Sequence, residues 1–249
     1  MGLSEDHQRY TVQARWTESL RAYLLNRAGI PENARVLEVG CGTGAVANTL
    51  DAYTKRPIFG LDIAFDSVRF AQKSGPFNRF TCGNALRLPF AAGAFDVVCC
   101  HFLLLWVKDA QAAVTEMARA CRRGGAVIAF AEPDYGGRVD YPQEMEEAGR
   151  LQALALARRG ADPNMGRRLA GLFNAAGMTE VETGVMAGQW SGQIAQDEWE
   201  SEWQTLERDL TGLAPKSQRA AWREADRRAW AEGSRVLFVP TFYALGRKK

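Results

Sequence analysis

The 249-residue sequence predicts an α/β fold in which a mainly parallel sheet carries helices on both faces. Between Arg35 and Phe130, short apolar runs alternate with stretches of helical periodicity. A glycine-rich turn follows the first of these runs, and an aspartate ends the second. Such alternation is typical of βαβ units, whose crossovers are almost always right-handed.

The expected elements of this region are short and regularly spaced. Strands are predicted at residues 36–39, 57–61, 79–82, 95–101 and 126–131. Helices are predicted at 45–53, 65–73 and 110–121. Upstream, Trp16, Leu20, Tyr23 and Leu24 recur at helical spacing, which predicts one amphipathic helix over about residues 9–28.

The second half of the chain is expected to complete the sheet and to add helices on its substrate side. Helices are predicted at 144–159 and 167–176, and strands at 180–186 and 236–245, the last strand forming an antiparallel edge. About 50 residues between these strands are too many for a loop, and helices are predicted at 196–213 and 215–232. We expect the tryptophans of this insertion to pack in the core or with one another, although two or three of them could wall an apolar or aromatic acceptor pocket. They are Trp190, Trp199, Trp203, Trp222 and Trp230.

The composition gives no support to several classes of protein. Thirty-one basic residues against 29 acidic ones give a net charge of +2, too weak to indicate a nucleic-acid partner. The amino-terminal stretch is polar, and no apolar run reaches the ~18 residues of a membrane span. Five cysteines without a Cys-x-x-Cys pair fit a reducing cytoplasm, and no metal-ligand spacing is present. A cytoplasmic monomer or homodimer without a metal is therefore expected.

The strongest chemical signal is the glycine-rich turn after the first expected strand. The sequence from Val36 to Gly44 reads Val-Leu-Glu-Val-Gly-Cys-Gly-Thr-Gly. Glycines at alternate positions permit tight backbone angles and let a ligand lie against the main chain. The turn predicts a nucleotide-type pocket, to which we assign Glu38, Gly40, Cys41, Gly42, Thr43 and Gly44.

Asp62 is the second signal, because it ends the next strand 20 residues after Gly42. A carboxylate at this distance can accept hydrogen bonds from both hydroxyls of a ribose. The alternative is an N-cap for the helix expected to begin at Phe65, and both roles are compatible.

The stretch from Glu38 to Gly44 resembles motif I of the class I S-adenosylmethionine-dependent methyltransferases, in which an acid precedes three alternating glycines. The resemblance covers about residues 10–135 and returns at the last strand pair. It implies a Rossmann-like, doubly wound sheet of seven strands with an antiparallel last strand. It also implies that Asp62 and Ile63 contact the ribose, and that Asn84 and Ala85, in a segment that usually carries aspartate, contact the adenine.

A nicotinamide dinucleotide is the main competing ligand, because it would share the strand, the turn and Asp62. Dinucleotide sites usually carry Gly-x-Gly-x-x-Gly to seat the pyrophosphate, whereas the third glycine here comes one residue early. Glu38 suits the positive amino group of the methyl donor and would repel a pyrophosphate. An NAD(P)-dependent oxidoreductase, or a protein that binds the donor without turnover, remains the alternative function.

Two residues are candidates for catalysis. The fourth strand ends at His101 and Phe102, and the carboxyl ends of parallel strands face the ligand crevice. We expect both residues near the donor methyl group, where His101 could accept a proton or simply line the pocket. Glu132 follows the fifth strand and could orient a substrate hydroxyl or amine. His7 lies in a polar stretch and is expected to be solvated.

Further residues are expected on the acceptor side. Tyr10, Gln13 and Trp16 lie on the segment that folds over the donor as a lid in similar methyltransferases, although packing on the sheet is favoured for Trp16. Trp106, Tyr135 and Arg138 follow the fourth and fifth strands, where loops usually supply substrate contacts.

These features predict a single methyltransferase domain over residues 1–249. Residues 1–30 form its helical lid, 31–135 the cofactor-binding core, and 136–249 the substrate-side helices and last strands, with the helical insertion at about 190–232. The expected reaction is an in-line attack by an oxygen, nitrogen or carbon atom of a small molecule on the methyl group of S-adenosylmethionine. The expected product of the donor is S-adenosylhomocysteine.

Overall fold

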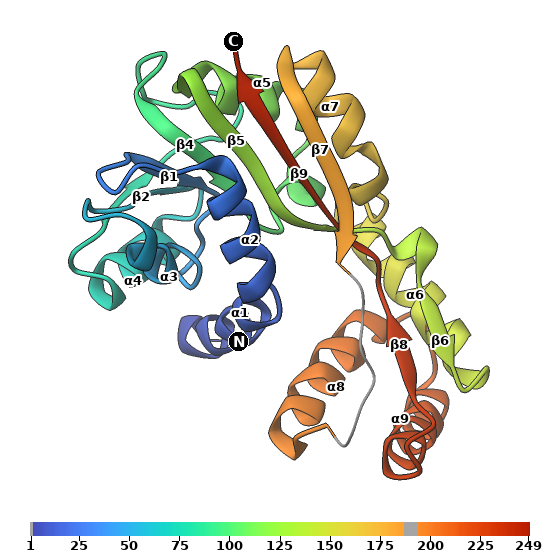
Figure 1. Ribbon diagram of the computed structural model, residues 1–249. Helices are drawn as coiled ribbons and strands as arrows, with labels where there is room; N and C mark the ends of the chain where they lie inside the picture. The colour runs from blue at the N-terminus through green and yellow to red at the C-terminus, as the bar shows by residue number, and fades with distance from the viewer. Residues whose placement is uncertain (1, 187–193) are drawn as a thin grey trace.

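The computed structural model describes residues 2–186 and 194–249, and its centre is a seven-stranded sheet (Figure 1). The strand order is β3-β2-β1-β4-β5-β9-β7. The strands are β1 (Val36–Val39), β2 (Phe59–Asp62), β3 (Arg79–Cys82), β4 (Phe95–Cys100), β5 (Cys121–Pro133), β7 (Met178–Met186) and β9 (Thr241–Lys248). The first five strands are parallel, and β9 pairs antiparallel with β5 and β7. The predicted doubly wound fold with an antiparallel last strand is confirmed.

Helices cover both faces of this sheet because successive side chains of each strand point to opposite sides. Val36 packs in one buried cluster with α2 (Glu18–Ala28) and α3 (Ala47–Leu50). Leu37 packs in the opposite cluster with α5 (Ala110–Ala120) and α7 (Leu169–Ala175). The helix α4 (Phe65–Ser74) lies against β2 and β3. Strands buried on both faces explain the apolar runs of the sequence.

A second group of elements, which we call the cap, lies at one end of the sheet (Figure 1). It consists of α6 (Glu144–Arg158), α8 (Gln196–Leu210), α9 (Lys216–Ala231) and a ribbon of β6 (Val139–Tyr141) with β8 (Val236–Phe238). Trp199, Trp203 and Trp222 are buried in its core, as expected for the insertion. Trp190 lies outside the described residues. The indole N–H groups of Trp199 and Trp203 both donate to Asp226, at 2.7 and 2.8 Å.

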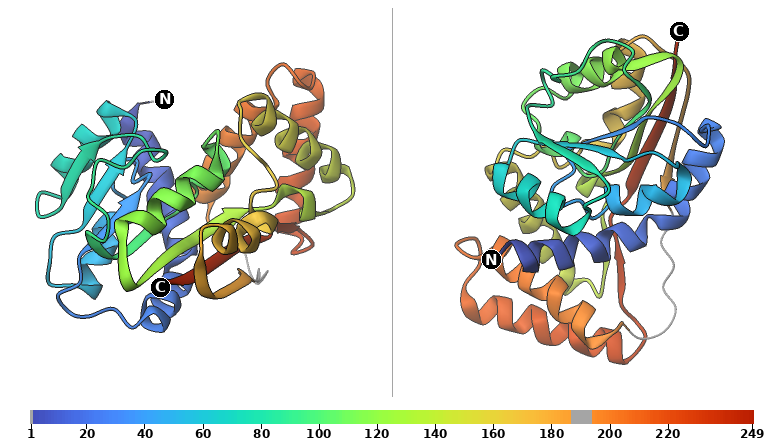
Figure 2. Two further views of the ribbon diagram at one scale, coloured as in Figure 1. Left: turned by 90° about the horizontal axis from the view of Figure 1, so that it is seen from above. Right: turned by 90° about the vertical axis from the view of Figure 1, so that its left-hand side faces the viewer.

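The amino-terminal helix differs from the prediction, because two helices take the place of one. The first, α1 (Leu3–Trp16), ends at Thr17, and α2 starts directly after it. The side chain of Thr17 is fully buried, and its Oγ1 lies 3.2 Å from the carbonyl oxygen of Ala14 and accepts from Arg21, so the break is held by contacts inside the protein. α1 runs beside α8 of the cap (Figure 2), and the indole of Trp16 donates to Glu198 across this contact.

The carboxyl-terminal strands also differ from the prediction. The expected strand 236–245 is two strands, β8 and β9, since Pro240 between them has no N–H to continue the ladder. β9 lies between β5 and β7 and is not the edge of the sheet, because β7 is. The segment after Glu132, expected as a loop, contributes β6 to the cap ribbon. No helix among the described residues has both the length and the apolar composition to cross a bilayer.

Candidate active site

The glycine turn has the backbone that the sequence pattern predicts. Gly40, Gly42 and Gly44 all have positive φ, of 76°, 50° and 83°. A Cβ at Gly40 would lie 2.6 Å from Cδ1 of Leu103, so no larger residue fits there without movement. Side chains with a Cβ rarely adopt this conformation, and the turn therefore needs glycine for its shape as well as for close approach of a ligand.

Asp62 holds the turn from the end of β2. Its Oδ2 accepts from the N–H of Gly42 at 2.8 Å, and its Oδ1 accepts from the N–H of Ala64 at 2.9 Å. The second bond falls just before α4 and not on a helix N–H, so Asp62 is not the N-cap of that helix. Each carboxylate oxygen can accept a further bond, and the side chain is partly exposed. Ile63 beside it is 72% exposed and available to cover a ligand.

Glu38 lies under the turn in the interior of the protein. Its side chain is buried, and Oε2 has no hydrogen-bond partner among the described residues. Burial raises the pKa of Glu38 to about 8, against the opposing effects of the Arg21 cation and the Ala47 N–H. A buried acceptor without a donor is costly. A ligand that brings a cationic N–H group to this oxygen would complete the site.

The residues expected at the adenine lie at the ends of β2 and β3. Asn84 is exposed, and its side-chain oxygen accepts from the N–H of Leu86 at 2.9 Å, leaving one lone pair for a ligand. The side chain of Ala85 packs in the core below the sheet edge. The thiol of Cys82 donates to the carbonyl of Ile63 at 3.4 Å and ties the two strand ends together.

α1 lies against the glycine turn. The Tyr10 ring lies against Gly42, where an added Cβ would be 3.7 Å from its Cε2 atom. His7 is not solvated as predicted, since its Nδ1 lies 2.9 Å from Oγ1 of Thr43 and its ring contacts Phe70. Gln13 is partly buried between these contacts and the end of the helix.

His101 at the end of β4 does not have the character of a strong base. Its Nε2 lies 3.0 Å from Oγ1 of Thr17, and the residue is only partly exposed. Burial, followed by the nearby Arg21 cation, lowers the pKa of His101 to about 3. The imidazole is therefore neutral at neutral pH and binds a proton weakly. Phe102 next to it has a positive φ of 49°, a strained conformation that turns the chain sharply after the strand.

Glu132 is placed differently from the expectation. The residue has no exposed surface, and its oxygens accept from the N–H groups of Leu103, Leu104 and Leu105 at 2.9, 2.8 and 3.1 Å. Burial raises the pKa of Glu132 to about 7, although these three N–H groups oppose the shift. These hydrogen bonds hold the start of the short helix η2 (Leu104–Trp106) in place. Because Glu132 at the end of β5 is buried by these contacts, it does not form part of an exposed ligand surface.

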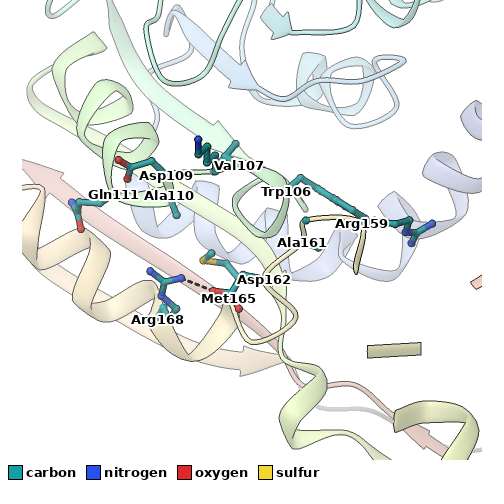
Figure 3. A pocket seen from close by; sticks show the side chains of 12 residues that line it. Trp106, Val107, Asp109, Ala110, Gln111, Arg159, Ala161, Asp162, Met165 and Arg168 are labelled. Atoms are coloured by element: carbon teal, nitrogen blue, oxygen red, sulfur yellow. Dashed lines mark hydrogen bonds and ion pairs between the residues drawn. The ribbon is translucent and has the colours of Figure 1, made fainter. Parts of the chain in front are cut away.

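The acceptor-side residues surround the junction of core and cap. Trp106 is 46% exposed, with the guanidinium of Arg159 stacked 5.6 Å from its ring centre. Both line an open cavity of about 520 Å³ beside the start of α5 (Figure 3). Tyr135 is partly buried, which raises its pKa to about 12. Arg138 is committed to the cap, because it forms a buried ion pair with Asp140 at 2.5 Å.

Three residues of the site were not foreseen. Thr17 and Arg21 connect α1 and α2 to His101, and Arg21 is 3% exposed. Both lie at helical spacing in the buried stripe that includes Ala14 and Leu24. The charged Arg21 within this otherwise apolar stripe is the sequence feature that could have identified them. Glu202 on α8 interacts with the charges of Glu198, Arg138 and Arg9, and burial raises its pKa to about 7.

Comparison with known proteins agrees with this geometry. Residues 37–129 match a family model described as a methyltransferase domain. An uncharacterized methyltransferase of Schizosaccharomyces pombe is 31% identical over 170 residues, 63% of this chain and 60% of that protein. A demethylmenaquinone methyltransferase of Renibacterium salmoninarum is 30% identical over 142 residues, 56% of this chain and 59% of that protein. The chain thus spans about six tenths of the length of these curated relatives.

A solved structure extends the similarity over almost the whole chain. A SAM-dependent methyltransferase from Thermotoga maritima aligns with 98% of this chain and 95% of its own, with a TM-score of 0.59. The sequences are 17% identical, so this similarity concerns the fold.

Proposed function

Since residues 37–129 form a methyltransferase domain of the class I, S-adenosylmethionine-dependent type, we propose that this chain transfers a methyl group from that donor to a small molecule. The observation that carries the proposal is the buried Oε2 of Glu38, which has no partner among the described residues. The amino group of S-adenosylmethionine would supply the missing donor. A pyrophosphate has no N–H group to donate to this oxygen, and its negative charge would lie close to the Asp62 carboxylate.

The other expected contacts with S-adenosylmethionine lie along the edge of the sheet. The backbone from Gly40 to Gly44, with Cys41 and Thr43, cradles the amino-acid end, and the second lone pairs of Asp62 accept the ribose hydroxyls. Asn84 and Ile63 flank the adenine side, and Phe102 the methyl side. S-adenosylmethionine supplies an electrophilic methyl group on a sulfonium. The chain supplies alignment and, through α1, exclusion of water.

The acceptor would bind between α1 and the cap, where Tyr135 and Glu202 supply polar groups. The Trp16 to Glu198 contact bridges α1 and α8 beside this place. The acidic α8 offers no basic surface for a nucleic acid. The reaction takes place on an oxygen, nitrogen or carbon atom without a strong base. Five free cysteines within the described residues agree with a reducing cytoplasm, and the whole chain acts as one domain.

Calorimetric titration with S-adenosylhomocysteine and with NAD⁺ tests the proposal. We expect the first compound to bind and the second not to, and Glu38→Gln to weaken binding at least tenfold. Glu146→Gln, on an exposed position of α6, is the matched control. Binding of NAD⁺, or equal affinity in wild type and Glu38→Gln, would refute the assignment. Incubation of the protein and radiolabelled donor with cell extract then identifies the methylated compound.

A further inference from the structure

Arg21 begins a line of hydrogen bonds that leads into the candidate active site. Its Nη1 donates to the carbonyl of Ala14 and to Oγ1 of Thr17, both at 2.5 Å, and its Nη2 donates to Thr49 at 3.3 Å. A guanidinium has only donors, so the direction of these bonds is not in question. The hydroxyl oxygen of Thr17 therefore accepts from a buried cation.

The single proton of the Thr17 hydroxyl has two acceptors within reach. The Ala14 carbonyl lies 3.2 Å away and already accepts from Arg21, whereas Nε2 of His101 lies 3.0 Å away. Nε2 has no other partner among the described residues. If Nε2 carried a proton instead, its N–H would point at Oγ1 of Thr17, which already accepts from the guanidinium of Arg21. The positive charge of Arg21 favours a lone pair at Nε2, so the Thr17 proton points to His101.

This direction determines which nitrogen of His101 carries the ring proton. A neutral imidazole whose Nε2 accepts has its N–H at Nδ1. Nδ1 has no hydrogen-bond partner in the described part of the chain, and His101 as a residue keeps some exposed surface at the end of β4. The low pKa of His101, caused by burial and by Arg21, keeps a second proton off the ring at neutral pH.

We infer that Thr17 and Arg21 are positioning residues, which hold His101 as the Nδ1–H tautomer so that it donates a hydrogen bond into the active site instead of removing a proton. This inference deepens the proposed function and rests on it for the identity of the bound molecule. An N–H donor suits an acceptor whose oxygen carries negative charge, such as an ionised hydroxyl or carboxylate group. The tautomer itself is a property of the protein alone.

Nitrogen-15 NMR of the imidazole rings tests the inference without any ligand. The chain has two histidines, so His7→Gln leaves His101 as the only imidazole and assigns its signals in the wild type. We expect Nδ1 to show the shift of a protonated nitrogen and Nε2 that of an unprotonated one, unchanged from pH 5 to pH 8. A proton on Nε2, or titration of the ring within this range, would overturn the inference.

Two variants separate the positioning residues from general effects on folding. Thr17→Val removes the donor and should move the ring toward the Nε2–H tautomer, whereas Thr17→Ser keeps the hydroxyl and should preserve the wild-type spectrum. Arg21→Met should raise the pKa of His101 toward its ordinary value of 6.5. If Thr17→Val keeps the wild-type tautomer, Thr17 is not a positioning residue; if this variant does not fold, the wild-type and Thr17→Ser spectra still decide. These spectra are recorded without ligand and do not depend on whether S-adenosylmethionine binds. A failure of the proposed function would therefore appear in the calorimetric titration and not in these spectra.

Discussion

Replacement of Glu132 by alanine should destabilise the protein strongly, because this carboxylate accepts from three consecutive backbone N–H groups. In Glu132→Ala, the N–H groups of Leu104 and Leu105 remain buried without an acceptor, while that of Leu103 is partly exposed and can turn to water. An unsatisfied buried donor costs about 1–3 kcal/mol, so the two together lower the free energy of unfolding by roughly 2–6 kcal/mol. In a chain of this size, that corresponds to a melting temperature at least about 4 °C lower.

Urea unfolding followed by tryptophan fluorescence measures this loss, and an unchanged slope m shows that the unfolded state is unaffected. Glu132→Gln keeps one acceptor oxygen and should lose less than Glu132→Ala. Glu146→Ala, an exposed change on α6, should stay within about 0.5 kcal/mol of wild type. A Glu132→Ala protein as stable as this control would refute the structural role, and Glu132 would again be a candidate for orienting the substrate.

Three further predictions concern the cofactor side. Asp62→Ala should weaken S-adenosylhomocysteine binding by about 1–3 kcal/mol, roughly 5- to 150-fold, because a charged acceptor is lost; in calorimetry the exposed Asp66→Ala serves as control, and equal affinities would remove the ribose role. Burial raises the pKa of Glu38 in the folded protein to about 8 from its ordinary 4.5, so its proton stabilises the fold at low pH and this contribution is lost as pH rises through 8. Glu38→Gln should accordingly flatten the decline of unfolding free energy between pH 5 and pH 8 in urea titrations, and an unchanged decline would contradict the shift. Gly40→Ala should lower the melting temperature more than Gly29→Ala. Both glycines have positive φ, but only at Gly40 would the added Cβ lie within 4 Å of a neighbour, Leu103. Equal decreases in melting temperature would mean that the backbone conformation alone causes the loss.

The sheet was predictable because its strands are buried on both faces and separated by turn-forming residues. The break at Thr17 was not, because the stripe of Ala14, Thr17, Arg21 and Leu24 keeps helical spacing through it. At this break Thr17 contacts the distant His101 as well as the neighbouring Ala14 and Arg21, and periodicity carries no information about a distant contact. Pro240 did offer a signal for the end of β8, since proline cannot donate to a ladder.

The candidate site was also predictable only in part. The shape of the glycine turn follows from residue type alone, and Asp62 meets Gly42 because parallel neighbours end at the same sheet edge. The characters of His101 and Glu132 depend on burial and on partners 84 and 27 to 29 residues away in sequence. Their residue types and positions in the sequence identified both as titratable groups near the crevice. They could not show that each side chain already forms hydrogen bonds within the protein.

The position of β9 has a consequence for how the chain is made. β5 and β7 reach their places earlier in synthesis, yet neither can pair with the other, because residues 241–248 fill the space between them. Until the ribosome has released those residues, two strand edges stay open to water and to other nascent chains. Unpaired edges are sites of aggregation, so the yield of folded protein should depend on how quickly β9 inserts between β5 and β7.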